Sequence, residues 1–273
     1  MGLRINQNIA AMNSYRNLSV TDGQMSKSLE KLSSGFRINR AADDAAGLAI
    51  SEGLRAQVGG LKVAVRNAQD GISVVQTAEG ALTETHSILQ RMRDLAVQAS
   101  NDGALSDTDK AKADAEYQEL VLELDDIANN TTFNGTNLLD GSYAGKDFQV
   151  GANANETLQI TIGDMTAATI MGAVGDLTDS ANAQTELAAV DTAIAAVSTQ
   201  RASLGATQNR LEHKINNLNV TVENLSASES RIRDTDMAQE MMSFTRSQIL
   251  TQAGTAMLSQ ANQASQGVLQ LLR

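Results

Sequence analysis

The sequence predicts a mainly α-helical protein, a long antiparallel coiled-coil or bundle hairpin with a small antiparallel β element in the middle of the chain. Three observations support this class. None of the 273 residues is Pro, only 3% are aromatic, and apolar residues recur at alternating spacings of four and three. A chain without Pro avoids helix breaks. A sustained heptad spacing keeps one apolar stripe against partner helices and implies left-handed supercoiling.

Three heptad runs predict the central helices. The first would form a rod of roughly 80 Å at 1.5 Å per residue. Its strict part contains Leu54, Val58, Leu61, Val65, Ala68, Ile72 and Val75, and a looser part continues through Leu82, Leu89, Met92, Ala96 and Ala99. The second contains Ala113, Tyr117, Leu120, Leu124 and Ile127. The third runs from Leu187 to Leu225, with polar breaks at Arg201 and Gln208 that suggest control of helix register.

The segment between the second and third runs has a different pattern. Asn134-Gly135 and Asp140-Gly141 are turn dipeptides. Apolar residues then alternate with polar ones on both sides of residues 151–155, which suit a hairpin loop. We therefore expect a β-hairpin within about residues 138–165, followed by a short connector at about 166–182 that is a loop or a short helix.

Both ends of the chain carry a weaker apolar stripe. Large aliphatic side chains are scarce there, and after Arg246 only Arg273 is charged. An isolated helix of this kind would be marginally stable in water, and its apolar residues need a partner. The two ends could cover each other, and neighbouring copies of the chain could cover the rest. The predicted assembly residues are Ile5, Ile9, Met12, Leu250, Met257, Ala261, Ala264, Val268, Leu271 and Leu272.

Composition argues against several classes of partner. The formal net charge is −11 and the pI is near 4.6, which disfavours nucleic acid and anionic membranes. No apolar run reaches the length of a membrane span, and the first residues lack the apolar core of a signal peptide. We therefore expect any export to use a route without a cleavable signal.

The sequence offers little for catalysis. It has no Cys, and its two histidines, His86 and His213, are far apart and outside any zinc-protease spacing. The adjacent acids at 43–44 and 125–126 have no nucleophile or metal-ligand set beside them. A boundary loop, a helix terminus or a solvated face explains these acids better. We therefore predict no catalytic, cofactor-binding or metal-binding residue, and no enzyme.

Several motifs, in order and with matching gaps, resemble those of bacterial flagellins. They lie at Leu3–Ile9, Leu32–Ser51, Thr132–Gly135, Lys146–Gly151 and Ala261–Leu272. The resemblance covers about the first 165 residues and about the last 90. Many flagellins carry large outer domains in the middle, whereas this chain has only the short connector.

The resemblance implies a subunit of the bacterial flagellar filament that self-assembles for swimming motility. Residues 1–44 and 232–273 would form a coiled coil lining the inner tube, and residues 45–231 a central rod domain. The chain would be exported unfolded by the flagellar type III apparatus to the extracellular filament. Its implied partners are further copies of itself, a secretion chaperone at the C-terminal segment, and the filament cap and hook-associated proteins.

The resemblance also implies recognition by an animal innate receptor, Toll-like receptor 5. The matching residues are Gln90, Arg91, Leu95 and Gln98 on the first rod helix, with Glu116 on the next. A solvated helix face, or a face buried between subunits, is the alternative explanation of these residues. The explanations are compatible, since one face can pack in the polymer and meet the receptor only in the monomer.

Two rival functions stay open from the sequence alone. An intracellular coiled-coil scaffold explains the heptads but not the glycine-containing motif from Gly35 to Leu48. The hook–filament junction protein shares helical ends with flagellins. The motif at Lys146–Gly151 favours the filament subunit over the junction protein.

Overall fold

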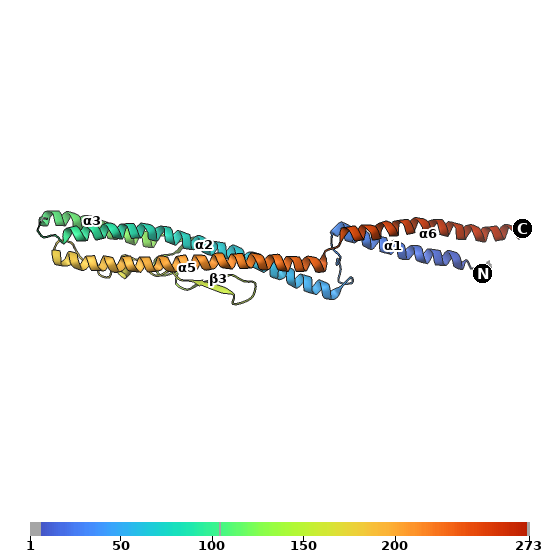
Figure 1. The fold of residues 1–273 in the computed structure, drawn as a ribbon, viewed down its shortest axis with the longest axis horizontal. Coiled ribbons are helices and arrows are strands. Elements are labelled where there is room, and N and C mark those ends of the chain that lie inside the picture. The colour runs from blue at the N-terminus through green and yellow to red at the C-terminus, as the bar shows by residue number, and fades with distance from the viewer. Residues whose placement is uncertain (1–6, 104, 272–273) are drawn as a thin grey trace. The chain divides into compact units, whose positions relative to one another are not determined.

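The computed structural model describes residues 7–103 and 105–271, with side chains through Gln263. It confirms the mainly α fold with antiparallel long helices and small antiparallel β elements (Figure 1). The helices in the described part are α1 (Ile9–Ser34), α2 (Ala45–Ala99), α3 (Asp107–Asn130), α4 (Ala167–Ile170), α5 (Ser180–Arg233) and α6 (Met237–Leu271). The strands are β1 (Thr132–Phe133), β2 (Thr136–Asn137), β3 (Lys146–Gln149) and β4 (Thr157–Ile160).

The chain forms two compact units. The rod unit comprises residues 57–223, and the terminal unit comprises residues 1–56 together with 224–273. The boundaries of these units lie inside α2 and α5. The sequence predicted a different division, at residues 44 and 232, between the segments that assemble in the filament and the central rod. That division stays a prediction.

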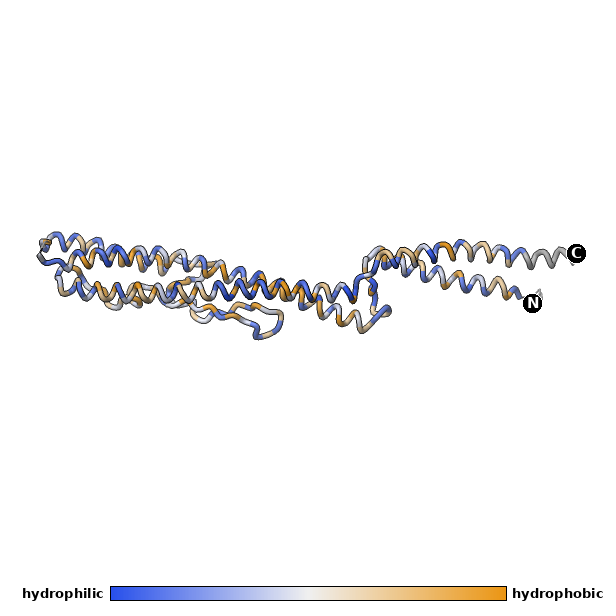
Figure 2. Tube along the Cα trace, in the orientation of Figure 1, coloured by the Kyte–Doolittle hydropathy of each residue, from blue (hydrophilic) through white to orange (hydrophobic). Residues whose placement is uncertain are grey.

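In the rod unit, α2 and α5 run antiparallel. Arg93 Nε of α2 lies 2.7 Å from Asp191 Oδ1 of α5, whereas the earlier Glu79 pairs with the later Arg201 at 3.6 Å. Helix α3 packs beside them, and heptad residues of all three helices belong to one buried core. Its fully buried side chains include Leu82, Leu89, Met92, Tyr117, Leu124 and Leu204. Figure 2 shows apolar residues alternating with polar ones along these helices. The apolar spacing of the sequence therefore corresponds to a packed core, as heptads require.

The predicted β element is present. Strands β3 and β4 pair antiparallel, with Lys146 opposite Ile160 and Gln149 opposite Thr157. Ile160 is buried in the rod core. The side chain of Asn67 on α2 donates a hydrogen bond of 3.0 Å to the carbonyl of Gln149, which ties the hairpin to the helix.

Strands β1 and β2 form a second, two-residue hairpin. Its turn is Asn134-Gly135, with φ values of 49° and 76°. Positive φ at both central residues is typical of a type I′ turn, the conformation that Asn-Gly favours. The connector after the β3–β4 hairpin contains the short helix α4, which is one of the two alternatives that the sequence left open.

The glycines inside α2 do not share one explanation. A close neighbour explains three of them. A Cβ at Gly47 would clash with the side chains of Asp44 and Ile38. A Cβ at Gly71 would lie 3.4 Å from Leu211, and one at Gly60 would lie 3.2 Å from the Cβ of Ala152. Gly53, Gly59 and Gly80 have open space where a Cβ would be. The structure shows no packing reason for these three.

In the terminal unit, α1 and α6 run antiparallel. The Asn8 side chain at the start of α1 donates a hydrogen bond of 2.9 Å to the carbonyl of Ala261, and Lys31 near its end lies 3.9 Å from Glu240. Asn8 also caps α1 by accepting from the N–H of Ala11 at 3.1 Å. Gly35 ends α1 in the left-handed conformation, with φ 76°. Among the described side chains of the two helices, those of Ser28 and Ser247 are buried, so much of each helix surface remains uncovered.

Candidate functional site

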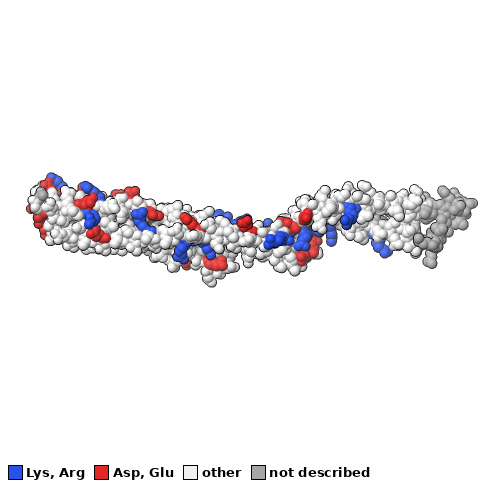
Figure 3. Space-filling view, viewed as in Figure 1, with Lys and Arg blue, Asp and Glu red and all other residues white. Residues whose placement is uncertain are grey.

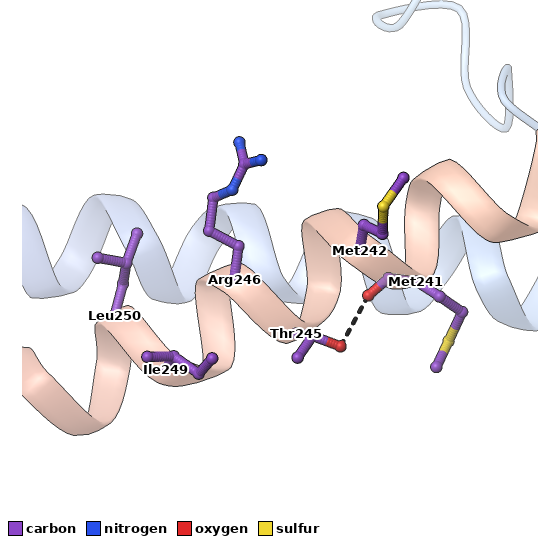
Figure 4. A pocket seen from close by; sticks show the side chains of 6 residues that line it. All are labelled: Met241, Met242, Thr245, Arg246, Ile249 and Leu250. Atoms are coloured by element: carbon purple, nitrogen blue, oxygen red, sulfur yellow. Dashed lines mark hydrogen bonds between the residues drawn. The ribbon is translucent and has the colours of Figure 1, made fainter.

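Helix α6 exposes a run of large apolar side chains. Met241, Thr245 and Ile249 follow one another at spacings of four, as do Met242, Arg246 and Leu250, so each set shares a helix face. These six residues line a groove of about 470 Å³, which we call the α6 groove (Figure 4). The Thr245 hydroxyl donates to the carbonyl of Met241 at 2.9 Å, so its polar atom is already bonded within the helix. The remaining lining is mostly apolar.

The exposure continues along both terminal helices. On α6, Met242 is 64% exposed and Met257 63%, and on α1 Met12 is 60% exposed. Single exposed apolar residues are ordinary on any protein, but many of them on two helices that pack against each other indicate an interaction surface. We call this set the terminal apolar surface. It consists of Ile9, Met12, Tyr15, Met241, Met242, Ile249, Leu250 and Met257.

The terminal apolar surface carries little charge. Within α6 only Glu240 and Arg246 are charged. Figure 3 shows charged side chains distributed along the rod unit, and few on the visible face of α1 and α6. Burying an unpaired charge is costly, so a surface without charges can be buried against another protein at little electrostatic cost. The composition of α6 therefore suits an interface.

The structure places part of the predicted assembly set on this surface. Ile9, Met12, Leu250 and Met257 are exposed, and Ala261 is half-buried beside Asn8. Ile5 and Leu272 lie outside the described residues. The side chains of Ala264, Val268 and Leu271 also lie outside the described part of the chain.

The predicted assembly set lacks four residues of the terminal apolar surface. They lie beside the four-and-three stripe rather than on it, and they are Tyr15, Met241, Met242 and Ile249. A heptad search looks for one stripe and therefore overlooks apolar residues on neighbouring faces. The low charge of α6 on all its faces is the signal that could have found those that lie on α6.

The predicted receptor-facing residues lie on α2 and α3. The guanidinium of Arg91 contacts the carboxylate of Glu116, with Nη2 and Oε1 2.6 Å apart, and both side chains are exposed. Gln90 is exposed and lies 2.9 Å from the ring of His86, and Gln98 is exposed as well. Leu95 is only 2% exposed. The structure thus brings Arg91 and Glu116 together, and it places Leu95 in the core below this face.

The adjacent acids at 43–44 bind backbone N–H groups. Asp43 accepts hydrogen bonds from the N–H groups of Arg40 at 3.0 Å and Asn39 at 3.2 Å, and these bonds lower the pKa of its carboxyl. Asp44 accepts from the N–H of Gly47 at 2.8 Å, at the start of α2. These bonds hold the turn between α1 and α2, in keeping with the interpretation of the pair as a boundary loop.

The acids at 125–126 have similar local roles. Asp125 accepts from the N–H of Ala167 at 2.8 Å, at the first residue of α4, and Asp126 accepts from the side chain of Asn130 at 2.6 Å. Within the described residues, no group of three or more His, Asp or Glu is placed to hold a metal ion. None of the described helices is long and apolar enough to cross a membrane.

A buried polar cluster joins α3, α5 and the connector. Glu186 of α5 is 4% exposed and accepts from the hydroxyl of Tyr117 at 2.8 Å and from the N–H of Gly175 at 2.9 Å. Burial and the neighbouring carboxylate raise the pKa of Tyr117 above its ordinary value. Asp114 accepts from the N–H of Leu177 at 2.9 Å. We call these residues the Tyr117–Glu186 cluster, and they fasten the connector to the rod.

Two family profiles match the chain. The profile described as the bacterial flagellin N-terminal helical region matches residues 5–144, and the one described as the C-terminal helical region matches residues 187–272. The chain is 55% identical to a flagellin of Halalkalibacterium halodurans over 271 residues, which are 98% of this chain and 99% of that one. It is 48% identical to the flagellar filament 33 kDa core protein of Treponema phagedenis, over 98% of this chain and 99% of that one.

Solved structures resemble parts of the chain. The crystal structure of a Bacillus cereus flagellin is 37% identical, with a TM-score of 0.51 over 56% of this chain and 88% of that chain. A putative flagellar hook-associated protein from Vibrio parahaemolyticus has a TM-score of 0.60 over 70% of this chain and 100% of that chain, at 15% identity. The second likeness concerns the fold alone, so it does not favour a junction role over a filament role.

Proposed function

The chain belongs to the bacterial flagellin family, and on that premise we propose that it is the structural subunit of a bacterial flagellar filament, built from many copies of itself. The observation that supports this function best is the terminal apolar surface. A single chain leaves it exposed although it is mostly uncharged, and further copies of the chain would cover it. The family match at both ends supports the same function.

Burial of the terminal apolar surface would supply the free energy of assembly. Apolar area removed from water contributes about 25 cal/mol per Å². Ordering a helix costs roughly 1–2 kcal/mol per residue, so weakly apolar terminal helices gain most of their stability when copies pack together. Folding of the ends and polymerisation are then coupled, which makes assembly depend steeply on subunit concentration.

A single substitution in the α6 groove tests the proposed function. Leu250 is 50% exposed, so Leu250→Asp should leave the free subunit folded. In the polymer it would bury a charge without a partner, which is strongly unfavourable. We expect seeded assembly, followed by light scattering and electron microscopy, to fall below detection for Leu250→Asp and to continue for Leu250→Met. Assembly of the Asp variant at the normal rate would contradict a buried role for this surface.

The proposal extends to the route out of the cell. The subunit would leave through the flagellar type III apparatus as an unfolded chain, as its membership of the flagellin family suggests. Neither Pro isomerisation nor disulfide formation can slow its refolding outside, since the chain has no Pro and no Cys. Its final location would be the extracellular filament, where it would also contact the filament cap and hook-associated proteins at the two filament ends.

We further propose that a secretion chaperone covers the C-terminal segment, about residues 234–273, before export. The α6 groove would otherwise promote premature association, because Met241, Met242 and Leu250 are exposed in a single chain. Tagged full-length chain, expressed in a flagellated host, should recover the chaperone by pull-down, and a chain lacking residues 234–273 should not. Equal recovery by both chains would place the chaperone site elsewhere.

Recognition by Toll-like receptor 5 is proposed for the exposed face around Arg91, Gln90, Gln98 and Glu116. Leu95 would support this face from the core rather than touch the receptor, since its side chain is buried. The Arg91–Glu116 pair offers a guanidinium and a carboxylate in fixed relative positions. Such a pair provides both donors and acceptors to a partner protein.

Arg91→Asp should weaken signalling by the monomeric protein in reporter cells, with a dose–response midpoint raised by about tenfold or more. The physical reason is the loss of the guanidinium donors and the new repulsion from Glu116. Arg93→Asp is the matched control, because it makes the same charge change two residues away and breaks the comparable bridge to Asp191. If both variants and the parent have the same dose–response midpoint, the face around Arg91 does not contact the receptor.

A further inference from the structure

The methionines of the chain divide between the two units by exposure. In the rod unit, Met92 is 0% exposed, and Met165 and Met171 are each 8% exposed. In the terminal unit, five of the described methionines are between 47% and 64% exposed, namely Met12, Met237, Met241, Met242 and Met257. The rod uses methionine as a core residue, whereas the terminal helices expose all their described methionines except the half-buried Met25.

Two of the exposed methionines lie side by side in the chain at the α6 groove. Met241 is 50% exposed and Met242 is 64% exposed, and Figure 4 shows their side chains projecting from α6 in different directions. Ile249 and Leu250 continue the apolar lining about two turns further along the helix. Both thioether sulfurs are thus accessible to a small solute in the free subunit, and both belong to the surface that the proposed function buries.

We propose that Met241 and Met242 are sites of oxidation by hydrogen peroxide, and that their conversion to methionine sulfoxide blocks self-assembly while the rod unit stays folded. The inference rests on the proposed function, since it assigns a chemical sensitivity to the same assembly surface. It adds a modification, a class of oxidant and two named residues.

The chemistry needs only peroxide and the thioether. A sulfur lone pair attacks one peroxide oxygen, so an S–O bond forms as the O–O bond breaks. The sulfur loses two electrons to the peroxide. The departing hydroxide takes the proton from the new S–OH group and leaves as water, and a neutral sulfoxide remains. Oxidised methionine is polar and chiral, and sulfoxide formation disrupts methionine-rich interfaces.

The consequence for assembly follows from the lining of the groove. In the free subunit, water can hydrogen-bond the sulfoxide oxygen. In an assembled interface, that oxygen would need a donor from the protein, and burying an acceptor without one is unfavourable. The hydroxyl of Thr245 already donates to the carbonyl of Met241, which leaves Arg246 as the charged donor of the groove. Oxidation therefore opposes burial of the groove and leaves the buried rod methionines unchanged.

The test treats soluble full-length subunit with hydrogen peroxide, removes the oxidant with catalase, and adds filament seeds. Peptide mass spectrometry should show sulfoxide at Met241 and Met242 well before Met92, Met165 or Met171. The critical concentration for seeded assembly should rise about tenfold, which corresponds to about 1.4 kcal/mol. Treatment with methionine sulfoxide reductases should restore the original value, because these enzymes reverse the modification. Far-UV circular dichroism and thermal unfolding of the rod should not change.

Paired variants separate the two proposed sites from the other methionines. The double variant Met241→Leu, Met242→Leu keeps the apolar volume of the groove and should be inhibited by peroxide much less than the parent, with the remaining inhibition coming from the exposed Met12 and Met257. The matched control Met165→Leu, Met171→Leu removes two methionines from the rod unit instead. Its assembly should remain sensitive to peroxide. Full inhibition of the groove variant by peroxide would overturn the assignment to Met241 and Met242.

The untreated parent protein distinguishes failure of this inference from failure of the proposed function. If untreated subunit does not extend seeds, the filament function fails and the inference fails with it. If untreated subunit extends seeds, and subunit with confirmed sulfoxide at both positions extends them equally well, only the inference is overturned. Oxidation of the rod methionines at the same rate as Met241 and Met242 would also overturn it.

Discussion

A chain cut to residues 45–231 is expected to remain a folded, soluble monomer that does not polymerise at any concentration at which the full chain does. The reason is the location of the core. The buried cluster of α2, α3, α5 and the β-hairpins begins at Ala68 and ends at Leu211, so the cut removes none of it. The cut does remove α1 and α6, and with them the terminal apolar surface.

Circular dichroism, sedimentation and seeded light scattering test this prediction together. Full-length monomer should gain helicity per residue when it is seeded, because its terminal helices become ordered against neighbouring copies. The cut chain should show no change in helicity and should sediment as a monomer with or without seeds. Filaments formed by the cut chain would show that α1 and α6 are dispensable. Full-length monomer that is already fully helical before seeding would show that folding and assembly are not coupled.

Replacement of Glu186 by Ala is expected to destabilise the rod unit by roughly 2–5 kcal/mol, because a buried donor left without a partner costs about 1–3 kcal/mol. Two donors lose their acceptor in this variant, the hydroxyl of Tyr117 and the N–H of Gly175. The missing side-chain volume adds a cavity term. Urea unfolding should show a lower midpoint at an unchanged slope, which indicates a loss of stability rather than a change in the unfolded state.

Two variants control for the loss of a carboxylate in general. Glu212→Ala removes an exposed carboxylate from the same helix, whose hydrogen bond of 2.9 Å to Gln208 is also exposed, so its effect should stay within about 0.5 kcal/mol. Glu186→Gln keeps a carbonyl oxygen as an acceptor and should lose less stability than Glu186→Ala. If Glu186→Ala and Glu212→Ala have the same unfolding midpoint, the Tyr117–Glu186 cluster does not stabilise the rod.

The same cluster predicts how stability changes at alkaline pH. Burial and the Glu186 carboxylate raise the pKa of Tyr117 in the folded state, while an unfolded Tyr ionises near pH 10. Because the pKa of Tyr117 is higher in the folded than in the unfolded state, the protonated hydroxyl stabilises the fold below about pH 10. This stabilisation is lost as pH rises above that value. Stability should therefore fall above about pH 10, and Tyr117→Phe should reduce the steepness of that fall. Burial also raises the pKa of Tyr143, so part of the fall should remain.

The sequence was sufficient for those features that depend on residues close together in the chain. Heptads from Leu54 to Leu225 predicted the long helices, because residues within two turns of each other decide which face of a helix is apolar. The Asn134-Gly135 turn followed from the preference of these two residues for positive φ. The predicted assembly role of the ends rested on their weak apolar stripes and, at the C-terminal end, on the low charge of α6. The family resemblance also rested on short contiguous motifs.

Only the tertiary structure decided which side chains from distant segments meet. Tyr117 and Glu186 are 69 residues apart, and their hydrogen bond depends on the register in which α3 packs against α5. Leu95 and Gln98 were both assigned to the receptor face because they belong to one motif. Packing against the other helices buries Leu95 and leaves Gln98 exposed. Likewise, a Cβ would meet open space at Gly80 and a close neighbour at Gly60, and the residues around each glycine in the sequence do not predict this difference. Local periodicity determines the helix, but the depth and partner of each side chain are set by segments far away in the chain.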